Sequence, residues 1–454
     1  MKVGGIWDAR GGRNWIGSIS RKNWETGLPI LLGAQPEDVV VCDNTSINLH
    51  KLISYAWGIK NSGNILLTES NHFPTDVYIA EGWIKSLKNY GVDAEIRFAD
   101  SHEQLLNCLD ENVAVVNVSY VDYRTSLRWD MGRLMQKAQE VGALVVWDLS
   151  HAAGAVEIDL MGNDADFAVG CGYKYLCGGP GAPAYLFIHP RHQNKQWPSI
   201  PGWMGHLDIY AFAGRYEPNP GIISQSTGSP VIIPNEIFSA AVEIWEKVSV
   251  REIDKKHESL TRLFHQLIPQ ECGSLGAEMI SPAKHSESGG HVSIRHPGAG
   301  PVSEALLEHG VVSSFRKPDS IRFEFHRCTI ASGYLGGNPT FEKGPFGRNL
   351  ERRKIPESLC LSLLKTRFYL ENKRRRCMEN QEEKEGSDLF QLYDLKVEVL
   401  SGEKPMVCDH QQGEHFFVIG ETSSFLKKAG SLFRFIPGCL AAVALRQTAV
   451  YRSQ

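Results

Sequence analysis

Apolar runs alternate with amphipathic stretches through roughly the first 235 residues of the chain. Seven of these runs are short and rich in β-branched residues, which is typical of strands buried on both faces of a sheet. Because helix-like stretches separate them, the pattern predicts repeated β–α units and a mainly parallel seven-stranded sheet. The predicted strands are 37–43, 64–69, 93–99, 113–121, 142–150, 166–174 and 183–190.

The stretch between Asp130 and Gly142 is the clearest predicted helix. Asp130 is a favourable N-cap residue, and Gly142 is a stop signal. Between them, Leu134, Met135 and Ala138 recur at helical spacing and share one apolar face.

The pattern changes after residue 234. Residues 235–268 predict one or two long helices, and two strand-like runs, 291–296 and 320–325, flank a helix-like stretch. We therefore expect an α/β protein with a smaller α+β domain towards the C-terminus. The predicted division is a large domain 31–235, a small domain 236–325, and two flanking segments, 1–30 and 326–454, of which the second has weak periodicity and clustered charge.

Composition narrows the class of protein. The apolar fraction of 42% and the charged fraction of 22% are those of a globular chain, and a net charge of −4 gives no electrostatic case for nucleic acid or an anionic membrane. The apolar runs are too short to span a bilayer, and the first residues lack a signal-peptide core. None of the ten cysteines forms a C-x-x-C pair, so we expect a cytoplasmic protein with reduced thiols and no metal site.

Two charged residues end neighbouring predicted strands. Asp148 closes one apolar run, and Lys174 closes the next among glycines and tyrosines. Desolvation favours the neutral amine that forms an imine with an aldehyde, and a carboxylate keeps a pyridine nitrogen protonated. The pair therefore favours a pyridoxal 5'-phosphate site at the carboxyl edge of the sheet. The alternatives are a surface lysine and an aspartate that caps the following turn.

Further residues suit the other parts of that cofactor. Thr45 and Ser46 precede a helix-like run, and a helix N-terminus binds phosphate, although Ser46 alone is equally a plain N-cap. Phe73 offers a ring for stacking, and Asp76 a second carboxylate. The alternative for this motif is a turn built around Pro74.

These motifs together resemble the kynureninase family in its bacterial form. The resemblance covers roughly residues 30–325 and rests mainly on "NTSINLH", "NHFPTD", "WDLSHAAGAVEIDL", "GCGYKYLCGGPG" and "SIRFEF". It implies the fold-type-I architecture of pyridoxal-phosphate enzymes and a homodimer. It also implies hydrolysis of L-kynurenine, or 3-hydroxykynurenine, to anthranilate, or 3-hydroxyanthranilate, and L-alanine, within tryptophan catabolism and NAD biosynthesis. The choice between the two substrates stays open.

The resemblance also implies roles for single residues. Lys174 matches the imine lysine, Asp148 the partner of the pyridine nitrogen, and His151 its neighbour. Tyr173 matches a phosphate ligand that also carries protons, and Arg322 the residue that grips the substrate α-carboxylate. The other implied cofactor positions are Thr45, Ser46, Phe73, Pro74, Thr75, Asp76 and Ser119, with Trp203 and Ser229 from the neighbouring subunit.

The two flanking segments depart from the family pattern. Members carry a further N-terminal segment with a glycine-rich motif, and residues 326–454 match nothing in the family; a shifted reading frame and a divergent tail both explain this. Two rival functions follow. One is an inactive or unstable relative of kynureninase. The other is a different fold-type-I enzyme such as a cysteine desulfurase, although Tyr173, rather than the histidine common there, precedes Lys174.

Overall fold

A computed structural model describes residues 27–324, apart from 61, 247 and 310, and the backbone of two short strands, β12 (Leu395–Glu398) and β13 (His415–Val418). The chain divides into two compact units. Residues 14–370 contain the α/β fold, and the antiparallel β12–β13 pair belongs to the other unit. The predicted segments 1–30 and 326–454 otherwise lie almost wholly outside the described residues.

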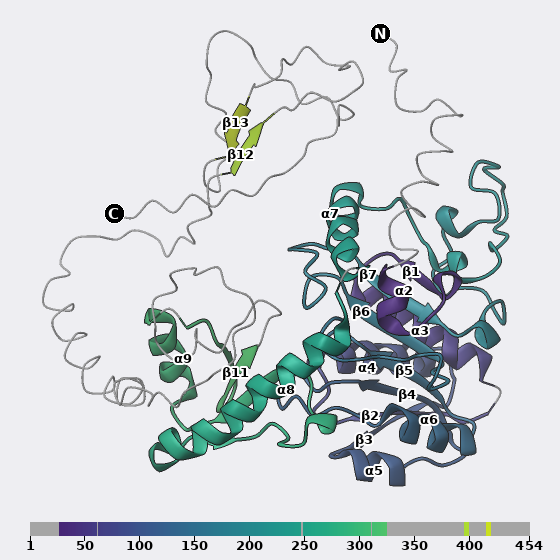
Figure 1. The fold of residues 1–454 in the computed structure, drawn as a ribbon. Helices are drawn as coiled ribbons and strands as arrows, with labels where there is room; N and C mark the ends of the chain where they lie inside the picture. The colour runs from purple at the N-terminus through teal and green to yellow at the C-terminus, as the bar shows by residue number, and fades with distance from the viewer. Residues whose placement is uncertain are drawn as a thin grey trace, which may run out of the picture. The chain divides into compact units, whose positions relative to one another are not determined.

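The large domain is built on a seven-stranded sheet, in the order β1-β7-β6-β5-β4-β2-β3 (Figure 1). All neighbours from β6 to β3 pair in parallel, whereas β7 runs antiparallel to both β6 and β1. The predicted, mainly parallel sheet is therefore confirmed, with shorter strands than the sequence indicated. Their bounds are β1 Val39–Val41, β2 Ile65–Glu69, β3 Glu95–Ala99, β4 Val113–Ser119, β5 Leu144–Asp148, β6 Phe167–Cys171 and β7 Ala184–Ile188.

Both faces of this sheet are buried. Leu66 and Val146 belong to one apolar cluster and their neighbours Leu67 and Val145 to another, because successive side chains of a strand point to opposite faces. The helices that join the strands supply the rest of these clusters. They are α3 Thr45–Ile59, α4 Pro74–Asn89, α5 His102–Asn107 and α6 Met131–Glu140, with α2 Gly27–Leu32 and α7 Ile232–Val242 adding to the cluster that contains Leu67 and Val145.

Helix α6 confirms its sequence signals. The carboxylate of Asp130 accepts a hydrogen bond from the Arg133 amide (3.0 Å), Leu134 and Ala138 are fully buried, and Gly142 has a φ of +69° beyond the helix end. Ser46 is not the N-cap of helix α3, which was one interpretation of the sequence. Its N-cap is Asn44 rather than Ser46, because the helix already begins at Thr45 and the Asn44 side chain accepts from the Ile47 amide.

The small domain packs helices on a second sheet of four antiparallel strands, in the order β10-β11-β9-β8. Leu260, Val292, Ile321 and Phe323 form its core. The region 235–268 resolves into two helices, α7 and α8, of which only α8 contributes to this core. The elements are α8 Val250–Leu267, β8 Glu278–Met279, β9 His291–Arg295, α9 Ala299–Glu308, β10 Ser314–Arg316 and β11 Ser320–Glu324.

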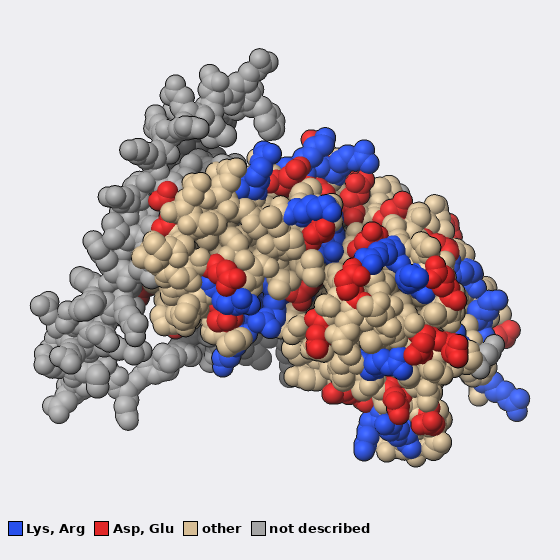
Figure 2. Space-filling view, turned by 90° about the horizontal axis from the view of Figure 1, so that it is seen from below, with Lys and Arg blue, Asp and Glu red and all other residues tan. Residues whose placement is uncertain are grey.

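The surface agrees with the small net charge. Figure 2 shows acidic and basic side chains interspersed over the viewed face, without a broad field of one sign. Among the described residues, no helix combines the length and apolarity that a bilayer crossing requires, and no group of three or more His, Cys, Asp or Glu side chains is arranged to hold a metal ion.

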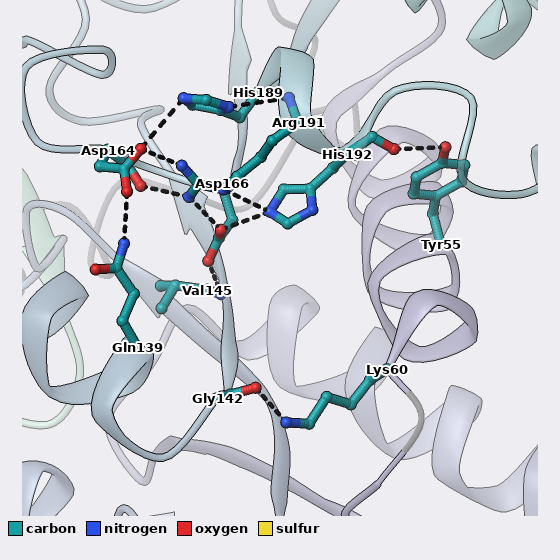
Figure 3. A network of polar contacts seen from close by, with 10 residues as sticks. All are labelled: Tyr55, Lys60, Gln139, Gly142, Val145, Asp164, Asp166, His189, Arg191 and His192. Atoms are coloured by element: carbon teal, nitrogen blue, oxygen red, sulfur yellow. Dashed lines mark hydrogen bonds and ion pairs between the residues drawn. The ribbon is translucent and has the colours of Figure 1, made fainter.

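A buried carboxylate ties together the amino edge of the large sheet (Figure 3). Asp166, which immediately precedes β6, accepts from the Val145 amide at 2.9 Å, from Arg191 at 2.5 Å, and lies 2.7 Å from Nε2 of His192. It is 2% exposed. One side chain thus joins the starts of β5 and β6 to the segment that follows β7, at the edge opposite the ends of the parallel strands.

We predict that Asp166→Ala lowers the free energy of unfolding by about 3–5 kcal/mol, because the buried Val145 amide and His192 ring lose their acceptor and Arg191 keeps only one of its two carboxylates, Asp164. Denaturant unfolding measures this. Glu157→Gln is the control, since Glu157 and Arg251 are an exposed ion pair whose loss should cost under about 1 kcal/mol. Equal small losses in both variants would show that the network does not hold the edge together.

Candidate active site

Lys174 lies in the turn that follows β6, half-buried, on the wall of a cavity of about 310 Å³. Arg322, from β11 of the small domain, lines the same cavity. The two predicted site residues therefore meet although they lie far apart in the chain. The cavity is lined by Tyr173, Lys174, Tyr175, Arg322 and Glu324.

Two carboxylates gather near the lysine. Asp148 ends β5, is 3% exposed, and is placed by parallel pairing opposite Ser119 of β4. Asp76, in the first turn of α4, is equally buried, and its pKa is raised well above the usual value by burial first and then by the charge of Asp148, while Lys174 acts in the opposite direction. The three groups thus form one electrostatic cluster at the carboxyl edge of the sheet.

Asp148 also makes the local contact that the alternative interpretation required. Its Oδ1 accepts from the Ser150 amide at 2.9 Å, as in a capped turn. A carboxylate has a second oxygen and several lone pairs, so this contact fixes the orientation of the side chain and uses only part of its acceptor capacity.

The amine of Lys174 lies between aromatic rings. Its Nζ is 5.6 Å from the ring centroid of Phe73 and 5.8 Å from that of Tyr173. Phe73 in turn packs edge-on against Tyr123 at 5.3 Å. The alternative interpretation of this motif was a turn built around Pro74. In the structure Pro74 is the first residue of α4, and Phe73 is the N-cap of that helix. The ring is therefore held at a helix entry, facing the lysine.

The N-terminus of α3 presents Thr45 and Ser46, both partly exposed. Behind them, the fully buried Lys51 donates to the carboxylate of Asp43 (2.5 Å) and to the carbonyl oxygen of Gln225 (2.6 Å). This buried ammonium ties the segment around Gln225 to the start of the helix. Thr75 lies in the first turn of α4.

Trp203 and Ser229 occupy the segment between β7 and α7. Trp203 begins a short 3₁₀ helix and is partly exposed, and Ser229 is exposed. The amide of Met204 donates to the carbonyl oxygen of Thr227 (3.3 Å), which holds this segment together. Neither Trp203 nor Ser229 lines the Lys174 cavity within a single chain.

Arg322 is 7% exposed and is held by the large domain. Its Nη1 donates to the carbonyl oxygen of Tyr123 (3.0 Å) and lies 3.5 Å from Nε2 of His151, while Nη2 lies 2.5 Å from Oε1 of Glu324. Arg322 and Glu324 thus form an ion pair on one face of β11, which is not an edge strand. Strand β11 lies between β10 and β9, and Ile321 is buried on the opposite face, as alternation predicts.

Two residues near the site, His291 and Tyr175, were not predicted from the sequence. His291 is fully buried at the start of β9, with its ring 6.1 Å from that of His151. Burial, and then nearby cations, hold the pKa of both histidines well below the usual value, so both rings are neutral. The only local signal was a polar residue opening an apolar strand, which indicates no partner by itself.

Buried polar atoms around the cavity lack hydrogen-bond partners within the described chain. Such atoms are rare in folded proteins, and each favours a bound polar group. They come from both the large and the small domain, so the residues present fit a large polar ligand such as pyridoxal phosphate with its substrate. They are Asp76 Oδ2, Ser119 Oγ, His151 Nδ1, Tyr175 Oη, both His291 nitrogens and Arg322 Nε.

The chain is similar to kynureninases over about 70% of its length. A kynureninase C-terminal domain model matches residues 253–330. Kynureninase from Deinococcus radiodurans is 39% identical over 310 residues, covering 68% of this chain and 74% of that protein. Kynureninase from Pseudomonas fluorescens is 35% identical over 323 residues, covering 70% and 76%.

Solved structures share the fold at low identity. A cysteine desulfurase from Thermococcus onnurineus is 17% identical with a TM-score of 0.60, covering 71% of this chain and 82% of its own. Another solved structure, of a C-DES variant with glycine covalently linked to its PLP cofactor, is 16% identical with a TM-score of 0.61, covering 74% of this chain and 88% of its own. At this identity the likeness shows the fold alone.

The fold and the site define a pyridoxal-phosphate-dependent enzyme of fold type I. Two relatives that are more than one-third identical over most of their length specify it further. The chain belongs to the kynureninase family, whose members are hydrolases of a carbon–carbon bond. The desulfurase alternative has only the shared fold in its favour.

The neutral buried histidines predict a pH dependence. A group whose pKa is depressed in the folded protein gives stability that is present above its unfolded value, here 6.5, and lost as the pH falls towards the folded value. We predict that the free energy of unfolding of the parent falls below pH 6.5. In His291→Asn, this fall should be shallower by about 1.4 kcal/mol per pH unit, the effect of one proton. Thermal unfolding across pH measures the slopes, and parallel slopes would contradict a neutral buried His291.

Proposed function

We propose that this chain hydrolyses L-kynurenine, or its 3-hydroxy derivative, at the cavity that contains Lys174 and Arg322. The convergence of Lys174 and the buried Arg322 on that cavity carries the proposal, together with the two buried carboxylates, Asp76 and Asp148, that lie near the lysine. An amino acid whose α-amino group meets Lys174 can place its α-carboxylate on Arg322. The release of fluorescent anthranilate from kynurenine distinguishes this enzyme from an inactive or unstable relative that keeps the fold.

The cofactor supplies an electron sink when bound. Asp148 would accept from its pyridine nitrogen, with Asp76 behind it, and Phe73 would stack on its ring. Thr45 and Ser46, at the start of α3, suit the phosphate because helix amides and hydroxyl groups bind such anions. The remaining residues of this proposed set are Pro74, Thr75, Ser119, His151, Tyr173, Trp203 and Ser229.

Lys174 would form the covalent link to the cofactor and then move the proton at the substrate Cα. Tyr173 is 52% exposed at the cavity mouth and beside Lys174, where it can pass protons between site and solvent. Arg322 would hold the α-carboxylate so that the Cα–H bond faces the lysine. The buried, neutral His151 would accept hydrogen bonds without adding positive charge to the clamp.

The same proposal includes a cytoplasmic homodimer. Trp203 and Ser229 lie outside the Lys174 cavity of their own chain, which suits residues that complete the site of a partner. Exposed apolar side chains accompany them on the segment and on α7, including Phe212 at 83% and Ile233 at 49%. Burial of these side chains between two copies is what the family resemblance implies.

Lys174→Ala tests the assignment of the nucleophile. We expect it to abolish the visible absorbance of the lysine-linked cofactor and all release of fluorescent anthranilate from kynurenine, because the other described lysines do not line the cavity. Lys195→Ala, outside the cavity, is the control. A borohydride-reducible adduct that persists on the Lys174→Ala chain would place the imine elsewhere.

Arg322→Ala tests the carboxylate clamp. Loss of a charge-assisted pair in a desolvated site should weaken binding by about 2–5 kcal/mol, so KM should rise well over tenfold. Arg322→Lys should restore only part of this, since an ammonium cannot make two parallel hydrogen bonds. Steady-state kinetics with kynurenine measures both variants. An unchanged KM in Arg322→Ala would show that another residue binds the carboxylate.

A further inference from the structure

The three nitrogens of Arg322 lie in different surroundings. Nη1 is bound to the large domain through the carbonyl oxygen of Tyr123 (3.0 Å). Nη2 contacts Oε1 of Glu324 at 2.5 Å. Nε is buried and has no hydrogen-bond partner among the described residues. In a guanidinium group, Nε and Nη2 share one of the two edges that can donate two parallel hydrogen bonds to a carboxylate. Half of that edge is taken by Glu324, and half is free.

Glu324 differs from Arg322 in how readily it can move. The two residues are two apart on β11, so their side chains share one face, and both line the cavity that contains Lys174. The Glu324 side chain is 44% exposed, whereas that of Arg322 is 8% exposed. A rotation of the glutamate into water costs little, because water solvates the released carboxylate. The Arg322 side chain is buried and cannot turn into water in the same way.

The ion pair between Arg322 and Glu324 stabilises the site when no substrate is bound. A buried guanidinium that loses its counter-charge is strongly unfavourable, so a carboxylate on Nη2 stabilises the unliganded site. A substrate α-carboxylate would take over this role and would also satisfy Nε. The two hydrogen bonds of the substrate carboxylate replace the single contact of Glu324, so the exchange is favourable. The gain in binding free energy is smaller than it would be if Arg322 had no carboxylate partner beforehand.

We propose that Glu324 is an internal occupant of the carboxylate clamp, which the α-carboxylate of the substrate displaces, and that it thereby lowers the affinity of the site for amino acids. This inference rests on the proposed function, in which Arg322 is the clamp. It predicts that Glu324 weakens every ligand with an α-carboxylate by the same factor, whatever the rest of that ligand is.

The test uses the holoenzyme with L-alanine, the smaller product, and with kynurenine. Glu324→Gln should lower the dissociation constant of L-alanine, measured from the absorbance of the bound cofactor, by about two- to fivefold, as expected for a partly exposed ion pair. KM for kynurenine should fall by a similar factor. Glu278→Gln is the matched control, because Glu278 pairs with Arg295 in the same sheet but outside the cavity.

The outcomes separate the inference from the proposed function. If Arg322→Ala weakens L-alanine binding but Glu324→Gln leaves it unchanged or weakens it, the internal occupant is refuted and the clamp stands. If Arg322→Ala leaves L-alanine binding unchanged, the clamp and the occupant both fail. If Glu324→Gln does not fold, Glu324→Asp makes the same test, because the shorter side chain reaches Nη2 less well and should strengthen binding to a lesser degree.

Discussion

The parallel hydrogen-bond ladder between β4, β5 and β6 is the constraint on which the site depends. Parallel strands all end at one edge, so the ladder brings Ser119 opposite Asp148 and carries Lys174 to the same edge after β6. The continuous apolar sequence of these strands makes the ladder stable, since both faces are covered. A single slip in register would turn Asp148 into an apolar cluster, where its charge would have no partner.

The two edges of the sheet use buried charge differently. At the amino edge, Asp166 is surrounded by donors that all come from the protein, and the network is complete. At the carboxyl edge, Ser119 Oγ has no hydrogen-bond partner among the described residues, and neither has Nε of Arg322 in the cavity. An incomplete network destabilises the unliganded fold but leaves hydrogen-bonding capacity for a ligand. Stability is therefore concentrated at one edge and binding at the other.

Charges of both signs lie around the cavity. Asp148 opposes Lys174 and Glu324 opposes Arg322, whereas burial raises the pKa of Asp76 well above its usual value and keeps His151 and His291 neutral. A substrate that brings both an amine and a carboxylate preserves this balance. That requirement connects the electrostatics of the fold with the choice of an amino acid as substrate.

The sequence by itself determined the strands, helix α6, the position of Asp148 at a strand end and membership of the family, because each is encoded by local periodicity or a contiguous motif. It placed Lys174 at the end of a strand, whereas β6 ends at Cys171 and Lys174 lies in the turn that follows. Tertiary structure decided the rest. Glu324 alternates correctly in the sequence, but only the placement of β11 between two strands, with one face towards the large domain, brings it and Arg322 beside Lys174. His291 of β9 lies near His151 only because the small domain packs against the large one. Contacts between distant elements leave no periodic signal, since they depend on how whole domains pack.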